Sequence, residues 1–210
     1  FDDEVDMNAL MEEAAKYYSN ILWLFSPLVI RKIEEIQKLG LKIKVIAPSH
    51  GIIWRGNPMK IVEAYLKWAK DEAGKKILLA YDTMWGSTEK MALSMVEGIK
   101  SEGVEAMLFR LPVSDRGDII KELLDARGIL IGSSTINNGV LATVAPFLEE
   151  LQGLRPVNKV AAAFGSYGWG GGAVKTIEDK LQKAGIKIIA PAITVNWVPD
   201  KNELQKCFEL

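Results

Sequence analysis

One segment of the sequence places hydroxyl side chains and a glycine between an apolar run and a helical pattern: Thr83-Met84-Trp85-Gly86-Ser87-Thr88. Amide groups at a helix N-terminus have no partner inside the helix, and the helix dipole favours an anion there. The hydroxyls add hydrogen-bond donors, so this first loop is suited to a phosphate group. The alternative is ordinary capping of the helix by Ser87 or Thr88, because serine and threonine are common N-caps.

A second loop follows another apolar run and has no basic residue and no nucleophile–base pair: Gly132-Ser133-Ser134-Thr135-Ile136-Asn137-Asn138-Gly139. Its amides, hydroxyls and backbone groups suit a neutral, polar, planar ring system. The candidate binding residues are Ser134, Thr135, Ile136, Asn137, Asn138 and Gly139. A plain turn is the alternative, since Asn-Gly is a common turn signal.

A third loop combines two aromatic residues with several glycines: Gly165-Ser166-Tyr167-Gly168-Trp169-Gly170-Gly171-Gly172. Tyr167 and Trp169 offer faces for a flat ring, and glycine lets the backbone approach a ligand closely. Each aromatic residue taken alone is more often a packing residue. The candidates for binding are Ser166, Tyr167, Gly168, Trp169, Gly170 and Gly171.

Together, one loop for an anion and two for an aromatic ring describe a site for flavin mononucleotide (FMN). The residues from Gly168 to Ala173 also match the dinucleotide pattern G-x-G-x-x-A, but this match follows the fourth apolar run and not the first. No acidic residue ends the next run, where Pro191 and Ala192 stand. We therefore reject a nicotinamide site, and we expect no catalytic acid, base or nucleophile in the loops.

These loops need a sheet that brings them to one edge. The sequence alternates strand-like runs with helical patterns at intervals of a strand–helix–strand unit. This predicts a doubly wound α/β domain with five parallel strands, in which ligands bind at the carboxyl ends of the strands. The strands are expected at Ile77–Tyr81, Ala106–Leu111, Ile129–Ile131, Val160–Phe164 and Ile186–Ala190, and the helices at Ser87–Lys100, Asp118–Ala126, Thr143–Leu151 and Ala173–Ala184.

Residues 1–73 lack the regular alternation of strands and helices, and the polar segment Glu72–Lys76 separates them from the rest. Helices are expected at Met7–Asn20, from Ser26 to about Leu39, and at Pro58–Lys70, with one strand at Lys42–Ala47. Pro27 fits a first helical turn and Gly40 a helix end. These elements are too few to close a domain, and with Phe1 at the start we expect a cut inside a longer protein.

Composition excludes several classes of protein. The chain has 210 residues, of which 49% are hydrophobic, and this apolar content excludes a disordered chain. Its net charge is −1, so it lacks the excess of basic residues that is typical of nucleic-acid-binding proteins. No apolar run is long enough to cross a membrane. One cysteine, Cys207, excludes an internal disulfide and fits a reducing cytoplasm. One histidine, His50, excludes a multi-histidine metal site built from this chain alone.

From Lys75 to Leu210 the chain resembles the flavodoxin-like domain of the flavodiiron proteins (A-type flavoproteins). Short-chain flavodoxins usually carry T-x-T-G-x-T in the first loop, and here Trp85 replaces the middle threonine, as is frequent in flavodiiron proteins. The second loop with the following Pro146-Phe147-Leu148, and the third loop with Phe164, resemble the same family closely. The resemblance implies FMN as the cofactor.

Residues 1–73 resemble the C-terminal end of the metallo-β-lactamase-like diiron domain of that family, and residues 74–210 its flavodoxin-like FMN domain. The segment Ala47-Pro48-Ser49-His50-Gly51 matches the last iron-ligand motif, which makes His50 an expected iron ligand. Without the resemblance, a single histidine after a strand is more often structural or exposed. The H-x-E-x-D-H motif and the other ligands are absent and are expected upstream.

The resemblance implies an oxidoreductase in which FMN passes electrons to a non-haem diiron centre that reduces nitric oxide to nitrous oxide, dioxygen to water, or both. It further implies a donor such as rubredoxin and a head-to-tail homodimer, in the cytoplasm. Three alternatives stay open: a stand-alone flavodoxin-like carrier, a receiver-type signalling domain, and an assembly subunit. The signalling domain ranks low because Asp82 alone ends the first strand and Lys187 begins the fifth.

Overall fold

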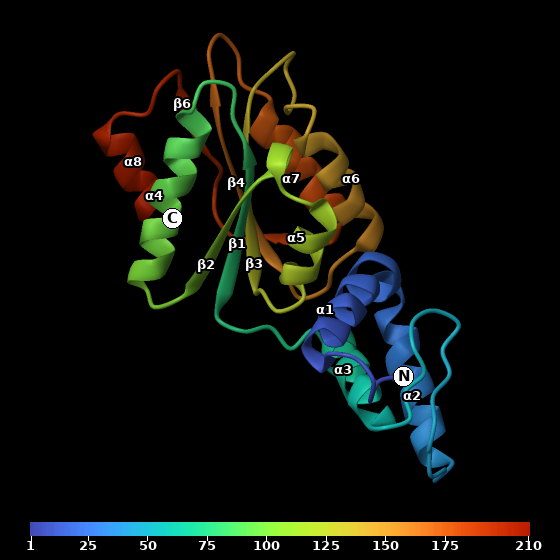
Figure 1. Ribbon diagram of the computed structural model, residues 1–210. Helices are drawn as coiled ribbons and strands as arrows, with labels where there is room; N and C mark the ends of the chain where they lie inside the picture. Colours follow the sequence, from blue (N-terminus) through green and yellow to red (C-terminus); the bar gives the residue numbers. More distant parts are fainter. The chain divides into compact units, whose positions relative to one another are not determined.

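The computed structural model describes all 210 residues. The chain forms two compact units, Phe1–Glu72 and Ala73–Leu210, and the division falls at the start of the polar segment Glu72–Lys76. Each unit is drawn in Figure 1. None of the helices combines the length and the apolar character that a membrane crossing needs.

The first unit is helical. Its elements are α1 (Met7–Tyr17), the π-helical turn η1 (Tyr18–Leu22), the 3₁₀ turn η2 (Trp23–Phe25), α2 (Ser26–Lys38) and α3 (Pro58–Lys70). Helices α2 and α3 pack against each other. An aromatic cluster fills the centre, where the rings of Tyr18, Tyr65 and Trp68 lie with centroids 5.0–5.7 Å apart.

Two expectations for this unit need correction. The helix expected at Met7–Asn20 is α-helical only to Tyr17 and continues as the π-helical turn η1, where the side chains of Ser19 and Asn20 donate hydrogen bonds to the Lys16 carbonyl at 3.1 and 2.8 Å. The strand expected at Lys42–Ala47 does not form: Ile46 makes one isolated antiparallel bridge with Trp54. An alternating pattern yields a strand only where a neighbouring strand supplies partners.

The second unit is a twisted parallel sheet with helices on both faces, which confirms the flavodoxin-like α/β class. The strands are β1 (Lys76–Asp82), β2 (Glu105–Arg110), β3 (Gly128–Ser134), β4 (Val160–Tyr167), β5 (Lys187–Ile188) and β6 (Ile193–Asn196). The helices are α4 (Ser87–Ser101), α5 (Arg116–Leu123), α6 (Val144–Leu154), α7 (Ala173–Lys183) and α8 (Lys201–Phe208), with a 3₁₀ turn η3 (Leu111–Val113). Figure 1 shows α4 and α8 on one face of the sheet and α5, α6 and α7 on the other.

The strand order is β2-β1-β3-β4-β5, with β6 also paired to β4. Because the chain leaves β1 for β2 on one side and returns to β3 on the other, the order reverses between β1 and β3, which is where such sheets bind ligands. The central strands are buried on both faces, as in Leu78, Leu79 and Ala80, and therefore read as continuous apolar runs. Met91 and Met95 of α4 pack with Phe164 of β4 in one buried core.

The fifth strand position is divided in two, which corrects the expected strand Ile186–Ala190. Strand β5 pairs with the start of β4, and β6 pairs with its end, from Phe164↔Ile193 to Tyr167↔Asn196. Pro191 lies in the interruption, and proline lacks the N–H that a strand donates. Helix α8 was not expected; it begins with a capping box of Asp200 and Glu203.

Candidate functional site

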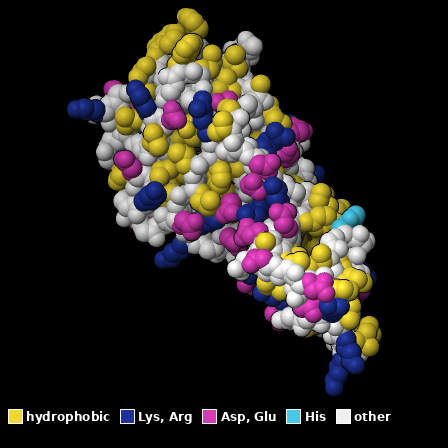
Figure 2. All heavy atoms as spheres, viewed as in Figure 1, with side chains coloured by type: hydrophobic (Ala, Val, Ile, Leu, Met, Phe, Trp, Pro, Cys, Tyr) yellow, Lys and Arg dark blue, Asp and Glu magenta, His cyan; other side chains and the backbone are white.

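A cleft of about 590 Å³ lies at the carboxyl ends of β1, β3 and β4, within the usual size range of small-molecule pockets. The three expected loops form it, together with the segment after β6. It is lined by Met84, Trp85 and Ser87 of the first loop, Ser134, Thr135, Ile136, Asn137 and Asn138 of the second, Ser166, Tyr167, Gly168, Trp169 and Gly170 of the third, and Trp197 and Val198. Figure 2 shows hydrophobic side chains gathered at this loop end of the second unit, at the top of the view.

The first loop ends on a bare helix terminus. Gly86 is the N-cap of α4 in a left-handed conformation with φ 85°, and no side chain caps the helix. The Thr83 hydroxyl accepts a hydrogen bond from the Gly86 amide at 3.1 Å and so shapes the loop. Capping by Ser87 or Thr88 is therefore excluded, and the terminal amides remain available to an anion.

Thr88 joins the three loops from beneath the cleft. Its side chain is fully buried, and its hydroxyl lies 3.0 Å from the hydroxyl of Ser134 and 3.0 Å from that of Ser166. Ser134 and Ser166 lie 3.2 Å apart, which closes a triangle of hydroxyls contributed by α4, β3 and β4. Buried hydroxyls that satisfy one another fix the elements that carry them.

Asp82, at the end of β1, orders the loops from a neighbouring position. Its carboxylate accepts hydrogen bonds from the Thr83 amide, at 2.7 Å, and from the Thr143 hydroxyl.

The second loop is closed by two hydrogen bonds between Ile136 and Gly139, at 2.8 and 3.1 Å. Asn137 and Asn138 have left-handed backbones, with φ of 48° and 58°, a conformation that asparagine tolerates better than most residues.

Glycines bring the loops into contact with one another. A Cβ on Gly172 would lie 2.1 Å from the Asn138 carbonyl oxygen, and one on Gly165 would lie 2.3 Å from that of Ser133. At Gly168 a Cβ would lie 2.8 Å from the Trp197 ring. The expectation that the glycines of this loop admit a ligand therefore needs a correction at Gly165 and Gly172, which admit another part of the protein, whereas Gly168 contacts Trp197 and also lines the cleft.

Eighteen residues of the chain were expected to bind a cofactor, and the structure brings most of them to the cleft. Five do not line it: Thr83, Gly86, Thr88, Gly139 and Gly171. Thr83, Gly86 and Thr88 shape or support the first loop, and Gly139 closes the second. Trp197 and Val198 were missed, because the last strand was expected to end at Ala190; the alternation in Ile193–Asn196 was the available signal.

The cleft has no charged side chain. Its polar groups are backbone amides, hydroxyls and the amide side chains of Asn137 and Asn138. Its aromatic surfaces are those of Trp85, Tyr167 and Trp169. Trp85 and Trp169 are 90% and 94% exposed, which is unusual for tryptophan and typical of residues that await a partner. Such a site suits a flat ring system that carries an anion and provides no acid–base pair.

Outside the cleft, the shifted pKa values belong to groups in the scaffold. Burial, together with the hydrogen bond that its hydroxyl donates to Glu89 at 2.8 Å, raises the pKa of Tyr81 to about 12. Burial raises the pKa of the Cys207 thiol to about 11, so this thiol is an inert core group.

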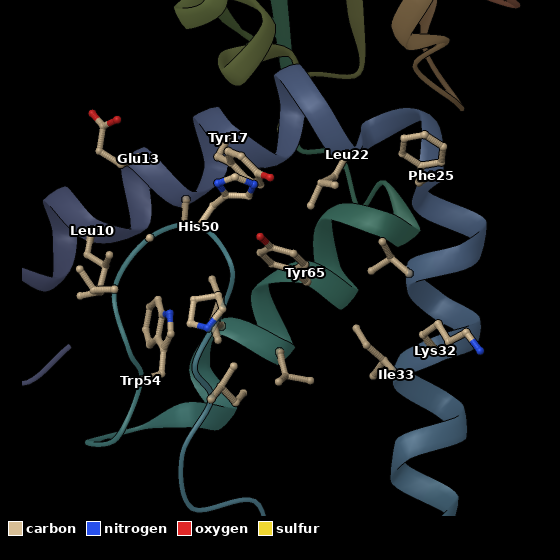
Figure 3. A pocket seen from close by; sticks show the side chains of 18 of the residues that line it. Leu10, Glu13, Tyr17, Leu22, Phe25, Lys32, Ile33, His50, Trp54 and Tyr65 are labelled. Atoms are coloured by element: carbon tan, nitrogen blue, oxygen red, sulfur yellow. The ribbon is translucent and has the colours of Figure 1, made fainter. Parts of the chain in front are cut away.

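His50 lies in the first unit, on the wall of an apolar pocket of about 730 Å³ (Figure 3). Figure 3 shows its ring facing Tyr17, with the ring centroids 5.7 Å apart. No group of three or more His, Cys, Asp or Glu side chains lies close enough to hold a metal ion. This chain alone does not supply a diiron site, and the role of His50 as a ligand stays a prediction.

Comparisons with known proteins agree with this geometry. Residues 79–210 match the flavodoxin family. A nitric oxide reductase of Moorella thermoacetica is 57% identical over 211 residues, covering 100% of this chain and 53% of the relative. The rubredoxin oxygen:oxidoreductase of Desulfovibrio gigas superposes with a TM-score of 0.94 at 33% identity, over 98% of this chain and 52% of that protein.

The flavodiiron protein from Giardia intestinalis superposes with a TM-score of 0.91 at 30% identity, over 100% of this chain and 52% of that one. The chain thus spans about half the length of these proteins. It belongs to the flavodoxin family and corresponds to the C-terminal part of the flavodiiron proteins.

Proposed function

We propose that the chain binds FMN in the cleft and serves as the electron-transfer domain of a flavodiiron reductase. The observation that carries this proposal is the cleft itself, where three loops converge at the reversal of strand order. The uncapped N-terminus of α4, with Ser87 beside it, suits the phosphate. Asn137 and Asn138 suit the polar edge of the ring system, and Tyr167 and Trp169 its faces.

FMN supplies the redox chemistry, since it accepts and returns electrons, and the protein binds, orients and tunes it. The residues of the cleft do what such a cofactor needs. The hydroxyl triangle fixes the loops, the aromatic side chains exclude water from the ring, and the helix terminus holds the phosphate. Electron transfer needs no nucleophile and no catalytic acid or base, and the cleft contains none.

The electrons pass, in this proposal, to a non-haem diiron centre that reduces nitric oxide to nitrous oxide, dioxygen to water, or both. The names of the relatives support this: one is a nitric oxide reductase and another a rubredoxin oxygen:oxidoreductase. His50 is proposed as one iron ligand. Iron in such sites takes several histidine and carboxylate ligands, so the others are expected from an upstream segment.

The first unit is proposed as the end of a metallo-β-lactamase-like domain. Large apolar side chains on its surface support this, since Leu39 is 68% exposed, Leu41 65% and Val45 54%. Exposure of this extent marks a surface that another part of a protein covers. A stand-alone FMN carrier is the second candidate function, and this apolar surface argues against it.

We further propose rubredoxin as the electron donor, in line with the name of the Desulfovibrio gigas protein, and a head-to-tail homodimer in the cytoplasm. A dimer brings the flavin of one chain to the irons of the other. Sedimentation of a protein that includes the upstream segment tests this point: a fully active monomer at micromolar concentration would contradict it.

The central test is reconstitution of the 210-residue chain with FMN. The expected result is one FMN bound per chain, with the absorption bands of bound flavin and quenched flavin fluorescence. Metal analysis of the same sample should find no stoichiometric iron. A chain that is folded, as judged by circular dichroism, and binds no FMN would overturn the proposal.

A further inference from the structure

The segment at the end of β6 holds the third loop of the cleft. The Trp197 amide donates a hydrogen bond to the Tyr167 carbonyl at 2.7 Å. The Asn196 side-chain amide donates to the Gly168 carbonyl at 2.6 Å and to the Tyr167 carbonyl at 3.3 Å. The backbone of the loop that carries Trp169 is therefore fixed by two residues that lie nearly thirty positions later in the chain.

The Trp197 ring lies against this same loop. It covers Gly168 so closely that a Cβ there would meet the ring at 2.8 Å. It also packs edge to face with Trp169, with centroids 5.1 Å apart and an angle of 81° between the ring planes. This is a favoured geometry for an aromatic pair. Trp197 thus sets the position of Trp169, which is otherwise almost fully exposed.

The backbone of Trp197 is in a conformation that a tryptophan rarely adopts. Its φ is +61°, in the left-handed region where glycine is free of strain and a bulky side chain is strained. The ring is only partly buried, since 53% of Trp197 remains exposed. Glycine would adopt this backbone conformation without strain, but it would lack the ring that faces the cleft.

The half-exposed side chain on this strained backbone lines the cleft. We infer that Trp197 is a positioning residue for the bound cofactor: it forms one wall of the cleft and holds Trp169 in place against the ring system. This inference rests on the proposed function. Trp197 should strengthen the binding of the ring system and not that of the phosphate, because the proposed phosphate site lies on the first loop.

The experiment compares two ligands, FMN and riboflavin, which share the ring system but not the phosphate. Dissociation constants are measured by flavin fluorescence for the 210-residue chain and for Trp197→Gly, Trp197→Phe, Ser87→Ala and Ile189→Ala. Trp197→Gly should weaken both ligands by the same factor, about two- to tenfold, which is the range for a lost aromatic contact. Trp197→Phe should restore part of the loss.

Two controls separate this effect from others. Ser87→Ala should weaken FMN and leave riboflavin unchanged. Ile189→Ala changes an exposed apolar residue that does not line the cleft, and it should change neither. In unfolding by denaturant without ligand, Trp197→Gly should unfold at nearly the same denaturant concentration as the parent chain, since relief of the positive φ offsets the lost packing against Trp169.

Three results would overturn the inference. The first is unchanged binding of both ligands in Trp197→Gly. The second is a loss of FMN binding with riboflavin binding retained. The third is a Trp197→Gly chain that is less stable or fails to fold, because Trp197 would then be an ordinary structural residue. If the parent chain itself binds neither flavin, the proposed function fails, and this outcome is distinct from the other three.

Discussion

The hydroxyl of Thr88 lies 3.0 Å from the hydroxyl of Ser166, so a hydrogen bond between two buried side chains joins the helix of the first loop to the strand of the third. We expect Thr88→Ala to weaken FMN binding by about 1–2 kcal/mol, because the loops lose a shared buried partner. Thr88→Ser keeps the hydroxyl and should retain most of the affinity. Equal affinities of all three chains, measured by fluorescence titration, would remove Thr88 from the site.

Trp169 is expected to contact the flavin ring. Its side chain is 94% exposed at the mouth of the cleft and is held by Trp197. An aromatic neighbour quenches flavin fluorescence, so Trp169→Phe should recover part of the emission lost on binding. Leu93→Ala, an exposed apolar change on α4 away from the cleft, serves as the control. Quenching that is the same in all three chains would exclude the contact.

Gly172 is expected to tolerate no side chain. In Gly172→Ala the new Cβ would lie 2.1 Å from the Asn138 carbonyl oxygen, so the second and third loops must separate. Overpacking of this kind costs about 1–3 kcal/mol, and we expect lower stability together with weaker FMN binding. Gly153→Ala has open space around its Cβ and should be neutral or stabilising. Unfolding curves and FMN titration of the two variants test this; an unaffected Gly172→Ala chain would contradict it.

Acid should loosen the first unit through Asp2. Hydrogen bonds from the backbone amides of Gly56, Asn57 and Arg55, at 2.9, 2.8 and 2.7 Å, lower the pKa of Asp2 from 3.8 to about 2. Because the pKa is lower in the folded state, the stabilisation is complete above pH 3.8 and is lost as the pH falls toward 2.

The measurement is an NMR titration of the Asp2 carboxyl, combined with amide exchange at residues 55–57. Asp2→Ala removes all three acceptors and should abolish the protection of these amides at neutral pH, whereas Asp3→Ala, on the more exposed neighbour, should leave it intact. An Asp2 carboxyl that titrates at its ordinary value would disprove the expectation.

His50→Ala tests the proposed iron site. In a protein that joins this chain to an upstream diiron segment, the substitution should lower the iron content and abolish reductase activity. FMN should stay bound, since His50 and the cleft belong to different units. Iron analysis and the flavin spectrum of the same sample provide both readings. Full iron and full turnover in the variant would leave the first unit without this role.

The sequence predicts the core of the fold well where the signal is local. Helix α3 has the bounds that its apolar spacing and Pro58 predict, and the buried strands β1, β3 and β4 appear as continuous apolar runs. The three loops follow from the rule that parallel strands end at one edge. Most of the residues that line the cleft could therefore be predicted from the chain alone.

What the sequence does not reveal depends on partners that are distant along the chain. The pattern at Lys42–Ala47 is that of a strand, but no neighbouring strand pairs with it. The loop-joining role of Thr88 depends on Ser134 and Ser166, 46 and 78 residues away. Trp197 was missed because Pro191 divides the fifth strand position: the expected strand ends at Ala190, and the short alternation Ile193–Asn196 lies beyond the proline.

The uncharged lining of the cleft has a consequence for the ionic strength at which the protein works. A phosphate held by lysine or arginine binds more weakly as salt screens the charges. Here the groups available to the phosphate are backbone amides and hydroxyls at the start of α4 and the dipole of that helix, and no cationic side chain lines the cleft. Added salt should therefore weaken the binding of FMN less than it would in a site built on lysine or arginine, so the domain would retain its flavin over a wider range of ionic strength.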